Sequence, residues 1–342
     1  MKRKVYLFLL FCLVVGSARA QVGGEYTYEF LELTNSARIA ALGGTQVAVP
    51  DSQDLNLPYV NPSLLDAEMS NRLLVNYVNY LTDVNYGYAS YAKTFEGIGN
   101  FAIGMHYINY GTFDEALETG ELTGLTFTAA EYALNLLYSN QYKRLHYGVN
   151  LKPIFSSLEN YQSFGLAADF GLSIKSKSGF TTLGFVARNV GTQITTYYDG
   201  ASHEEIPLNI QMGISHRLQH APIVFFATIQ HLNHWDLADS DEETEFSTET
   251  IYSYDESFVK QFMRHTVLGV ELQPSQNFTL RAGYNYQRRQ ELKFDNKASA
   301  VGFSAGFGIK IKRFHFDYGI SKFHLAGSSN LFSLSINLND NF

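Results

Sequence analysis

The sequence has one cysteine, few charged residues and no long apolar run beyond its first twenty residues. A single cysteine cannot form an intramolecular disulfide, so an exported form must be stabilised by packing or by backbone pairing. Charged residues make up 17% of the 342 positions, and no later apolar run reaches the ~18 residues of a membrane-spanning helix. These absences exclude a disulfide-rich secreted domain and a helical membrane protein.

Residues 1–20 have the pattern of an export signal. Basic residues at positions 2–4 are followed by the apolar stretch Val5–Val15 and the small-residue pattern Ala18-Arg19-Ala20. An uncleaved N-terminal anchor is the alternative, but the apolar stretch is shorter than the ~20 residues of a full span. We therefore predict that residues 1–20 are a signal peptide, removed on export.

Removal of this leader makes the chain more acidic. The whole sequence has a formal net charge of −8 at pH 7, and the leader holds four Lys or Arg and no acidic residue, so the mature chain carries −12. Nucleic-acid binding needs clustered Lys and Arg. The net charge therefore argues against a nucleic-acid partner.

Apolar and polar residues are interleaved rather than grouped. Aromatic residues reach 15% of the chain, yet the mean hydropathy is only −0.12. This combination is typical of a membrane β-barrel, in which lipid-facing and lumen-facing side chains alternate along each strand.

Alternation with period two covers most of the chain from residue 71 onward. Between Val301 and Ile311 every odd position is apolar and every even position is Gly, Ser or Lys, whereas a helix would need a spacing of 3.6. We predict an all-β fold, a transmembrane antiparallel β-barrel of about 14 strands. The predicted strands are Leu73–Tyr80, Tyr86–Ala92, Phe101–Tyr110, Thr126–Tyr138, Tyr147–Phe155, Phe164–Ile174, Phe180–Val190, Ile206–Leu218, Ile223–His231, Thr266–Leu272, Phe278–Gln287, Ala300–Ile311, Phe314–Phe323 and Leu331–Asn339.

The lengths of the links favour the same fold. Short links follow the even-numbered strands and most long links follow the odd-numbered ones, as in bacterial barrels with short periplasmic turns and long outer loops. A soluble β-sandwich also has period two, but Tyr and Phe on the alternating face and this sorting of the links favour the barrel. The long links are Gly111–Leu125, Gly191–Glu205, Leu232–His265 and Arg288–Ser299.

The segment after the leader does not alternate. Ser36–Gly44 predicts a short helix capped by glycine. Such a segment either fills the lumen or forms a periplasmic tail, and a lumen enclosed by fourteen strands is wide enough to need filling. The predicted organisation is a signal peptide (1–20), a short N-terminal plug (21–70) and a barrel (71–342).

The sequence contains no convincing catalytic or metal-binding pattern. Gly302–Gly306 matches the G-x-S-x-G motif, but that motif needs a turn from strand to helix, and here it lies inside an alternating strand. His231 and His234 could share a metal, yet no third ligand stands at a defined spacing. We predict no enzyme activity, no cofactor and no metal site.

Inward positions of the predicted strands include four charged residues. A charge inside a lumen needs a partner, so we predict a structural network in which these residues pair with one another or with the plug. They are Asp169, Arg188, Arg281 and Asp317.

Two predicted outer loops are candidate surfaces for a protein partner. The segment Asp236–Glu256 has nine acidic residues, no Lys or Arg and no EF-hand spacing. Aromatic residues on exposed loops are candidates for protein contacts. The candidates are Phe246, Tyr252 and Tyr254 in this loop, and Tyr197, Tyr198 and Asp199 in the loop before it.

Several segments resemble known outer-membrane proteins. Ser36–Gly44 and Asn61–Leu65 resemble the N-terminal segment of FadL-type barrels. The stretches Asn150–Ile154, Arg188–Ile194 and Tyr197–Gly200 resemble more particularly the PorV/PorQ group of the type IX secretion system of Bacteroidetes-type bacteria. The resemblance covers nearly the whole mature chain.

This resemblance implies a non-enzymatic component of the type IX protein secretion system, held among outer-membrane lipids. Such a barrel would anchor a secreted surface protein of the PorZ type at the cell exterior. The resemblance also implies a plug marked by Gly43, Gly44, Asn61 and Pro62, and it transfers no catalytic residue. The alternative is a FadL-like transporter of hydrophobic small molecules. An apolar pocket beside the plug that opens through the wall favours transport, and a sealed polar lumen favours anchoring.

Overall fold

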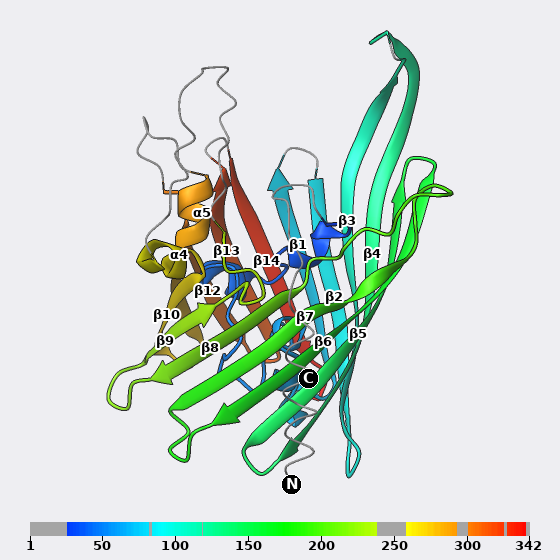
Figure 1. The fold of residues 1–342 in the computed structure, drawn as a ribbon. Helices are drawn as coiled ribbons and strands as arrows, with labels where there is room; N and C mark the ends of the chain where they lie inside the picture. Colours follow the sequence, from blue (N-terminus) through cyan, green and yellow to red (C-terminus); the bar gives the residue numbers. More distant parts are fainter. Residues whose placement is uncertain are drawn as a thin grey trace, which may run out of the picture.

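Fourteen strands form a closed antiparallel barrel in this computed structural model, which describes residues 26–81, 84–117, 119–237, 258–292, 300–324 and 327–339. Each strand pairs with its neighbours in sequence, and β1 pairs with β14 to close the ring (Figure 1). The fold class predicted from the alternation is confirmed. The strands are β1 (Arg72–Leu81), β2 (Val84–Phe95), β3 (Gly99–Ala116), β4 (Leu122–Tyr142), β5 (Leu145–Leu158), β6 (Tyr161–Lys175), β7 (Thr181–Thr195), β8 (Asn209–Arg217), β9 (Ile223–Ile229), β10 (Thr266–Ser275), β11 (Phe278–Asn285), β12 (Phe303–Ile311), β13 (Phe314–His324) and β14 (Gly327–Asn337).

The barrel wall is apolar outside and largely polar inside. On β6, Phe164, Leu166 and Phe170 are exposed, whereas Ser163 and Asp169 on the other face are buried. Exposed apolar side chains recur in this way on every side of the ring. A soluble sandwich would bury these side chains, so the outer surface is that of a barrel surrounded by lipid.

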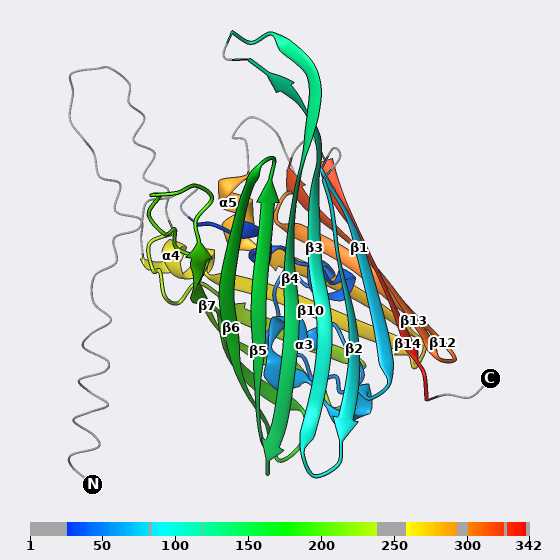
Figure 2. The same cartoon turned by 90° about the vertical axis from the view of Figure 1, so that its right-hand side faces the viewer.

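The wall is not equally tall all round. Strands β3 to β7 have 14 to 21 residues, and strands β8 to β12 have 7 to 10. Figure 2 shows β3 and β4 continuing beyond the rim as a long hairpin. The ends of the barrel therefore differ: a short-turn end, where the turns after even strands lie, and a long-loop end, where this hairpin lies.

This hairpin corrects the predicted link Gly111–Leu125, most of which is strand. Thr112 pairs with Thr128 and Phe113 with Phe127, and the two Phe rings stack with centroids 5.3 Å apart. Cross-strand pairs of β-branched and aromatic residues stabilise a ladder, so pairing continues past the rim.

Three other predicted boundaries are wrong. Strand β7 continues to Thr195, into the predicted loop 191–205, because it still pairs with β6 there. Strand β8 begins at Asn209 rather than at Ile206, because Pro207 has no backbone N–H to donate to a ladder. Helix α4 (Phe258–Arg264) lies within the predicted link 232–265. Helix α5 (Tyr286–Glu291) begins inside the predicted strand Phe278–Gln287, so that strand ends too late in the prediction, and it continues into the predicted link 288–299.

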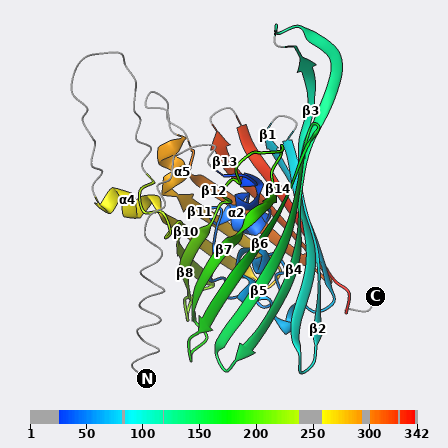
Figure 3. The ribbon, with the colours of Figure 1, turned by 45° about the vertical axis from the view of Figure 1, so that its right-hand side comes forward.

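Residues 26–71 lie inside the lumen, where most of their side chains are buried (Figure 3). We call this segment the plug. The predicted helix is present as α2: the Ser36 hydroxyl accepts a hydrogen bond from the Ile39 amide, and Gly43 and Gly44 end the helix with φ of 106° and 105°. The plug elements are η1 (Glu29–Glu32), α2 (Ala37–Ala41), α3 (Leu57–Val60), η2 (Pro62–Leu64) and η3 (Ala67–Met69).

Apolar side chains of the plug pack against the barrel interior. Phe30 and Leu31 of η1 form one buried cluster with Tyr86, Ile108 and Ile154, which lie towards the long-loop ends of their strands. Two further clusters lie deeper in the lumen. Among the described residues, no helix is long and apolar enough to cross a membrane.

Candidate functional site

The plug meets β5 and β6 through a seat of glycines. A Cβ atom on Gly148 would collide with the backbone of Pro62, and one on Gly171 would lie 2.9 Å from the Pro62 Cδ. The Asn61 side chain holds the local turn: its amide nitrogen donates to the Val47 carbonyl at 2.8 Å, and its oxygen accepts from the Ser63 amide at 3.1 Å. We call Asn61–Ser63 with Gly148 and Gly171 the glycine seat.

The end of helix α2 makes a similar close approach to β11. A Cβ on Gly283 would collide with the Gly43 amide nitrogen, so the two backbones are in contact. Gly44 accepts at its carbonyl from the Thr34 hydroxyl, 2.6 Å away. The four residues of the predicted plug motif, Gly43, Gly44, Asn61 and Pro62, thus lie where the plug backbone is positioned against the wall or turns.

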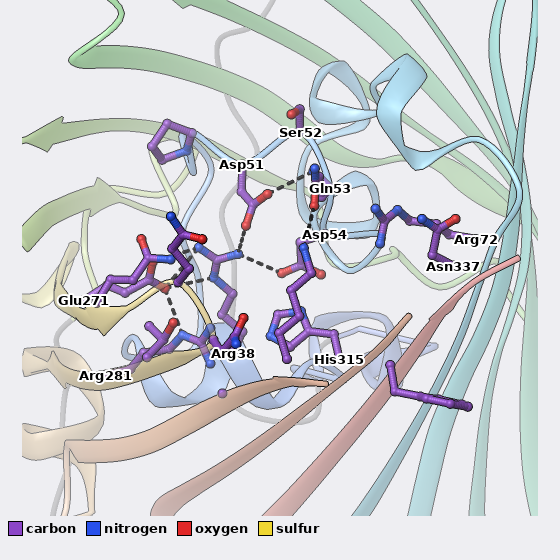
Figure 4. A pocket seen from close by; sticks show the side chains of 18 of the residues that line it. Arg38, Asp51, Ser52, Gln53, Asp54, Arg72, Glu271, Arg281, His315 and Asn337 are labelled. Carbon is purple, nitrogen blue, oxygen red and sulfur yellow. Dashed lines mark hydrogen bonds and ion pairs between the residues drawn. The ribbon is translucent and has the colours of Figure 1, made fainter. Parts of the chain in front are cut away.

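Arg38 is the centre of a buried charge network at the opposite side of the lumen (Figure 4). Its side chain extends from α2, and its Nε and Nη2 donate to the two carboxylate oxygens of Glu271 on β10 at 3.1 and 3.0 Å. Its Nη1 donates to Asp51 at 2.6 Å and to Asp54 at 3.1 Å. One guanidinium therefore ties the 51–54 loop of the plug to the barrel wall.

The network continues along the wall. Arg281 donates from Nε to Glu271 at 2.8 Å and pairs through Nη1 with Asp317 on β13. Residues Arg38, Glu271, Arg281 and Asp317 are each at most 6% exposed. We call these four residues with Asp51 and Asp54 the charged hub.

Asp51 is the member of the hub nearest to solvent, with 32% of its side chain exposed. Burial by itself raises the pKa of its carboxyl, but the adjacent Arg38 guanidinium outweighs burial and holds that pKa below its ordinary value. The carboxylate is therefore ionised at neutral pH, and its pair with Arg38 is retained.

A second network lies near the bulge of β7. Lys152 and Asp169 form an ion pair of 2.6 Å with side chains 1% exposed, and the Asn189 amide donates to Asp169 at 2.8 Å. The Asn189 side chain in turn donates to Glu32 of the plug at 2.7 Å, and Arg188 donates to the Leu31 carbonyl at 3.0 Å. This network fixes η1 to the wall.

The structure brings together some of the charged residues selected from the sequence. Arg281 and Asp317 pair with each other. Asp169 pairs instead with Lys152, and Arg188 lies against Glu32 and Leu31 of the plug.

Sequence reasoning missed Arg38, Lys152 and Glu271. Lys152 and Glu271 share the inward face of their strands with other buried residues, so strict parity along β5 and β10 could have identified them. Arg38 had no such signal, because it lies on a short helix within the plug.

The predicted partner residues are dispersed. The Tyr197 hydroxyl donates to the Ser156 hydroxyl at 2.8 Å, so this ring is tied to the barrel, whereas Tyr198 is 61% exposed and packs edge-on against Tyr161. Asp199 is exposed. The candidates Phe246, Tyr252 and Tyr254 lie outside the described residues.

The two principal cavities differ in size and lining. A cavity of about 300 Å³ lies at the short-turn end beside the charged hub, and its lining is mainly polar. A second, of about 10 Å³, lies between the plug and Arg188 and has room for about one water. Within the described ranges, no three His, Cys, Asp or Glu side chains are grouped to hold a metal ion.

Comparison with known proteins identifies the fold but not a family. No protein-family model and no curated protein matches the chain. The deltaS2 and deltaS2S3 mutants of the TodX monoaromatic hydrocarbon channel, each 13% identical, align over 90% and 89% of this chain and 98% and 99% of theirs, with TM-scores of 0.50 and 0.52. A FadL homologue from Pseudomonas aeruginosa, 12% identical, aligns over 89% of this chain and 98% of its own with a TM-score of 0.47.

At this level of identity the likeness concerns architecture. None of these three structures is described as a type IX component, so that part of the sequence resemblance stays a prediction. The chain is a closed fourteen-strand β-barrel, and its architecture is similar to that of the TodX channel structures.

Proposed function

We propose that this protein is an outer-membrane barrel that transports hydrophobic small molecules. The observation that carries the proposal is the alignment with the TodX monoaromatic hydrocarbon channel, which includes nearly all of both chains. The lipid-facing belt of exposed apolar side chains supports the membrane location. This is the function that we considered second from the sequence.

The interior near the long-loop end suits a hydrophobic cargo. Phe30 and Leu31 of the plug cover an apolar surface formed by Tyr86, Ile108 and Ile154. A water-filled pore has polar lining positions, whereas this surface would be available to an apolar molecule if η1 moved. The adjacent cavity of about 10 Å³ is too small for any such cargo, so transport requires movement of the plug.

Uptake measurements test the proposal. Cells without a hydrocarbon channel of their own would express the protein, and the initial uptake of radiolabelled toluene would be measured against cells with an empty vector. We expect faster uptake with the protein, and a loss of that gain in Ile108→Glu, which places a charge on the apolar surface. Ile108→Leu is the matched control and should retain uptake. Equal uptake with and without the protein would overturn the proposal.

A second candidate is the anchoring of a type IX surface protein. Many of the buried side chains between plug and wall are polar, which fits a static anchor. The β3–β4 hairpin extends beyond the rim and offers a surface for a partner (Figure 1). Affinity purification of a tagged form from detergent-solubilised outer membranes, followed by mass spectrometry, tests it. A surface protein of the PorZ type in the eluate would favour this candidate, and an eluate without any type IX protein would rule it out.

A further inference from the structure

The cavity at the short-turn end has a positively charged lining in an otherwise acidic chain. It is bounded by the 50–54 loop of the plug, by the short-turn ends of β10 to β14, by Arg72 of β1 and by Arg217 of β8. The mature chain is acidic and has only 21 Lys or Arg after residue 20. Seven of them line this one cavity, against three acidic residues.

The acidic residues of the lining do not neutralise the positive charge of its seven cations. Asp51, Asp54 and Glu271 are all engaged by Arg38, and Glu271 also by Arg281. Asp317, which is not part of the lining, pairs with Arg281 and so neutralises one more positive charge. Five further cations line the cavity. In the described ranges, no carboxylate lies within 4 Å of the side-chain nitrogens of four of these five, Arg72, Arg217, Lys310 and Lys312.

Arg72 gives a second, independent indication. Only 8% of this residue is exposed, and its Nε donates to the Glu68 carbonyl at 3.1 Å. Across the residues that the structure describes, its two terminal nitrogens have no hydrogen-bond partner. Figure 4 shows the side chain extending from β1 towards Gln53 and Asp54, into the cavity. These two nitrogens are free donors at the cavity wall, where an anion or water can accept from them.

We propose that this cavity is a binding site for a small hydrophilic oxyanion, one that bears phosphate or carboxylate groups. The planar donor fork of arginine matches both groups in a bidentate way, and five of the seven cations are arginines. A volume of about 300 Å³ is at the lower end of ligand pockets. The polar lining excludes an apolar ligand, so this site is separate from the proposed hydrophobic path and does not depend on it.

Titration calorimetry on the detergent-purified full-length protein tests this site. Inorganic pyrophosphate and citrate are the two probes, since they separate phosphate from carboxylate recognition. We expect at least one of them to bind, with an affinity that falls as salt rises. Loss of one charge-assisted contact should weaken binding roughly tenfold. Arg217→Gln and Arg72→Gln are therefore each expected to reduce the affinity by about that factor.

Lys177→Gln is the matched control, because Lys177 is an exposed cation in the β6–β7 turn at the same end but outside the cavity. It should bind the probe as the unchanged protein does. The thermal unfolding of each variant shows that the barrel is intact, and the exposed Arg217 keeps the test valid if Arg72→Gln does not fold. Absence of binding by both probes, or an affinity that neither cavity variant lowers, would refute the site.

Discussion

At the short-turn ends of β5 and β6 the plug is held by the close uncharged packing of the glycine seat, whereas at the short-turn ends of β10 to β13 it is held by the buried ion pairs of the charged hub. The glycine seat leaves no room for even one added carbon atom at Gly148. The charged hub instead depends on Arg38 and its three carboxylate partners, and it borders a cavity of about 300 Å³.

The two sides of the plug differ in how readily they can separate from the wall. When close packing is lost, water cannot replace the van der Waals contacts between the apolar groups. Buried ion pairs are different, because water or another anion from the adjacent cavity can replace a partner. We therefore expect plug movement to begin at the charged hub, with the glycine seat as the fixed side.

The largest expected effect is that of Arg38→Met. It leaves Glu271, Asp51 and Asp54 without their shared cation, and breaking a buried pair costs about 3–5 kcal/mol. The opening free energy of the plug should fall by that amount, measured as faster hydrogen exchange of the α2 amides. Lys177→Met, which removes a positive charge from an exposed turn, should leave this exchange unchanged.

Gly171→Ala tests the opposite side and should have the next largest effect. The added carbon meets Asn61 and Pro62, and overpacking of this kind costs about 1–3 kcal/mol. The hydrogen exchange of the amides of Asn61 and of residues 63–65 should accelerate. Ser173→Ala is the control on the same inward face, since the hydroxyl of Ser173 has no hydrogen-bond partner to lose. Unchanged exchange in Gly171→Ala would mean that the seat does not fix the plug.

A smaller effect is expected from removing both members of a pair. Arg38→Met combined with Glu271→Leu removes both members of this contact, so neither loses the other as a partner. The double variant should therefore be less destabilised than the sum of the two single variants. The coupling expected for contacting residues is about 0.5–3 kcal/mol. Additive effects within measurement error would show that the Arg38–Glu271 contact contributes nothing specific.

The smallest expected effect is a dependence on pH. Because Arg38 holds the pKa of Asp51 below its ordinary value, this pair stabilises the plug above the unfolded pKa of about 4 and is lost as pH falls through the lower, folded value. Once the exchange rates are corrected for the intrinsic pH dependence of amide exchange, the protection of the amides of residues 51–54 should therefore fall below its value at pH 7 only in acid. Asp51→Asn should remove this acid-dependent part, and an unchanged pH profile in that variant would assign it to another group.

The barrel could be predicted from the sequence because alternation is a local signal repeated in fourteen strands. The prediction from alternation failed in the β3–β4 hairpin, where strand pairing continues beyond the rim of the barrel. Alternation is lost there because no lipid requires apolar residues on one face of the strands. The short helix at Ser36–Gly44 followed from its capping residues.

The charged hub could be predicted only in part. The alternation of side chains along β11 and β13 places Arg281 and Asp317 on the inward face, and the two residues form an ion pair. The role of Arg38 depends on how an irregular segment folds within the lumen, which no periodicity encodes. Three of the seven cations of the cavity lie together at the β12–β13 turn, at positions 310, 312 and 313, but the other four come from distant parts of the chain and form no local pattern.

A reversible disulfide between the plug and the wall, on the side of the charged hub, tests most directly whether transport requires movement of the plug. The Ala37 amide of α2 lies 3.1 Å from the Ser333 hydroxyl of β14, so Ala37→Cys with Ser333→Cys should form a disulfide in a chain that has no other cysteine after residue 20. Toluene uptake would be measured before and after reduction, with Ala37→Cys alone as control. If the plug must move, the oxidised double variant takes up toluene no faster than cells with an empty vector, and reduction restores the faster uptake. Equal uptake in the oxidised and reduced forms would contradict transport through a plug that opens from the charged side.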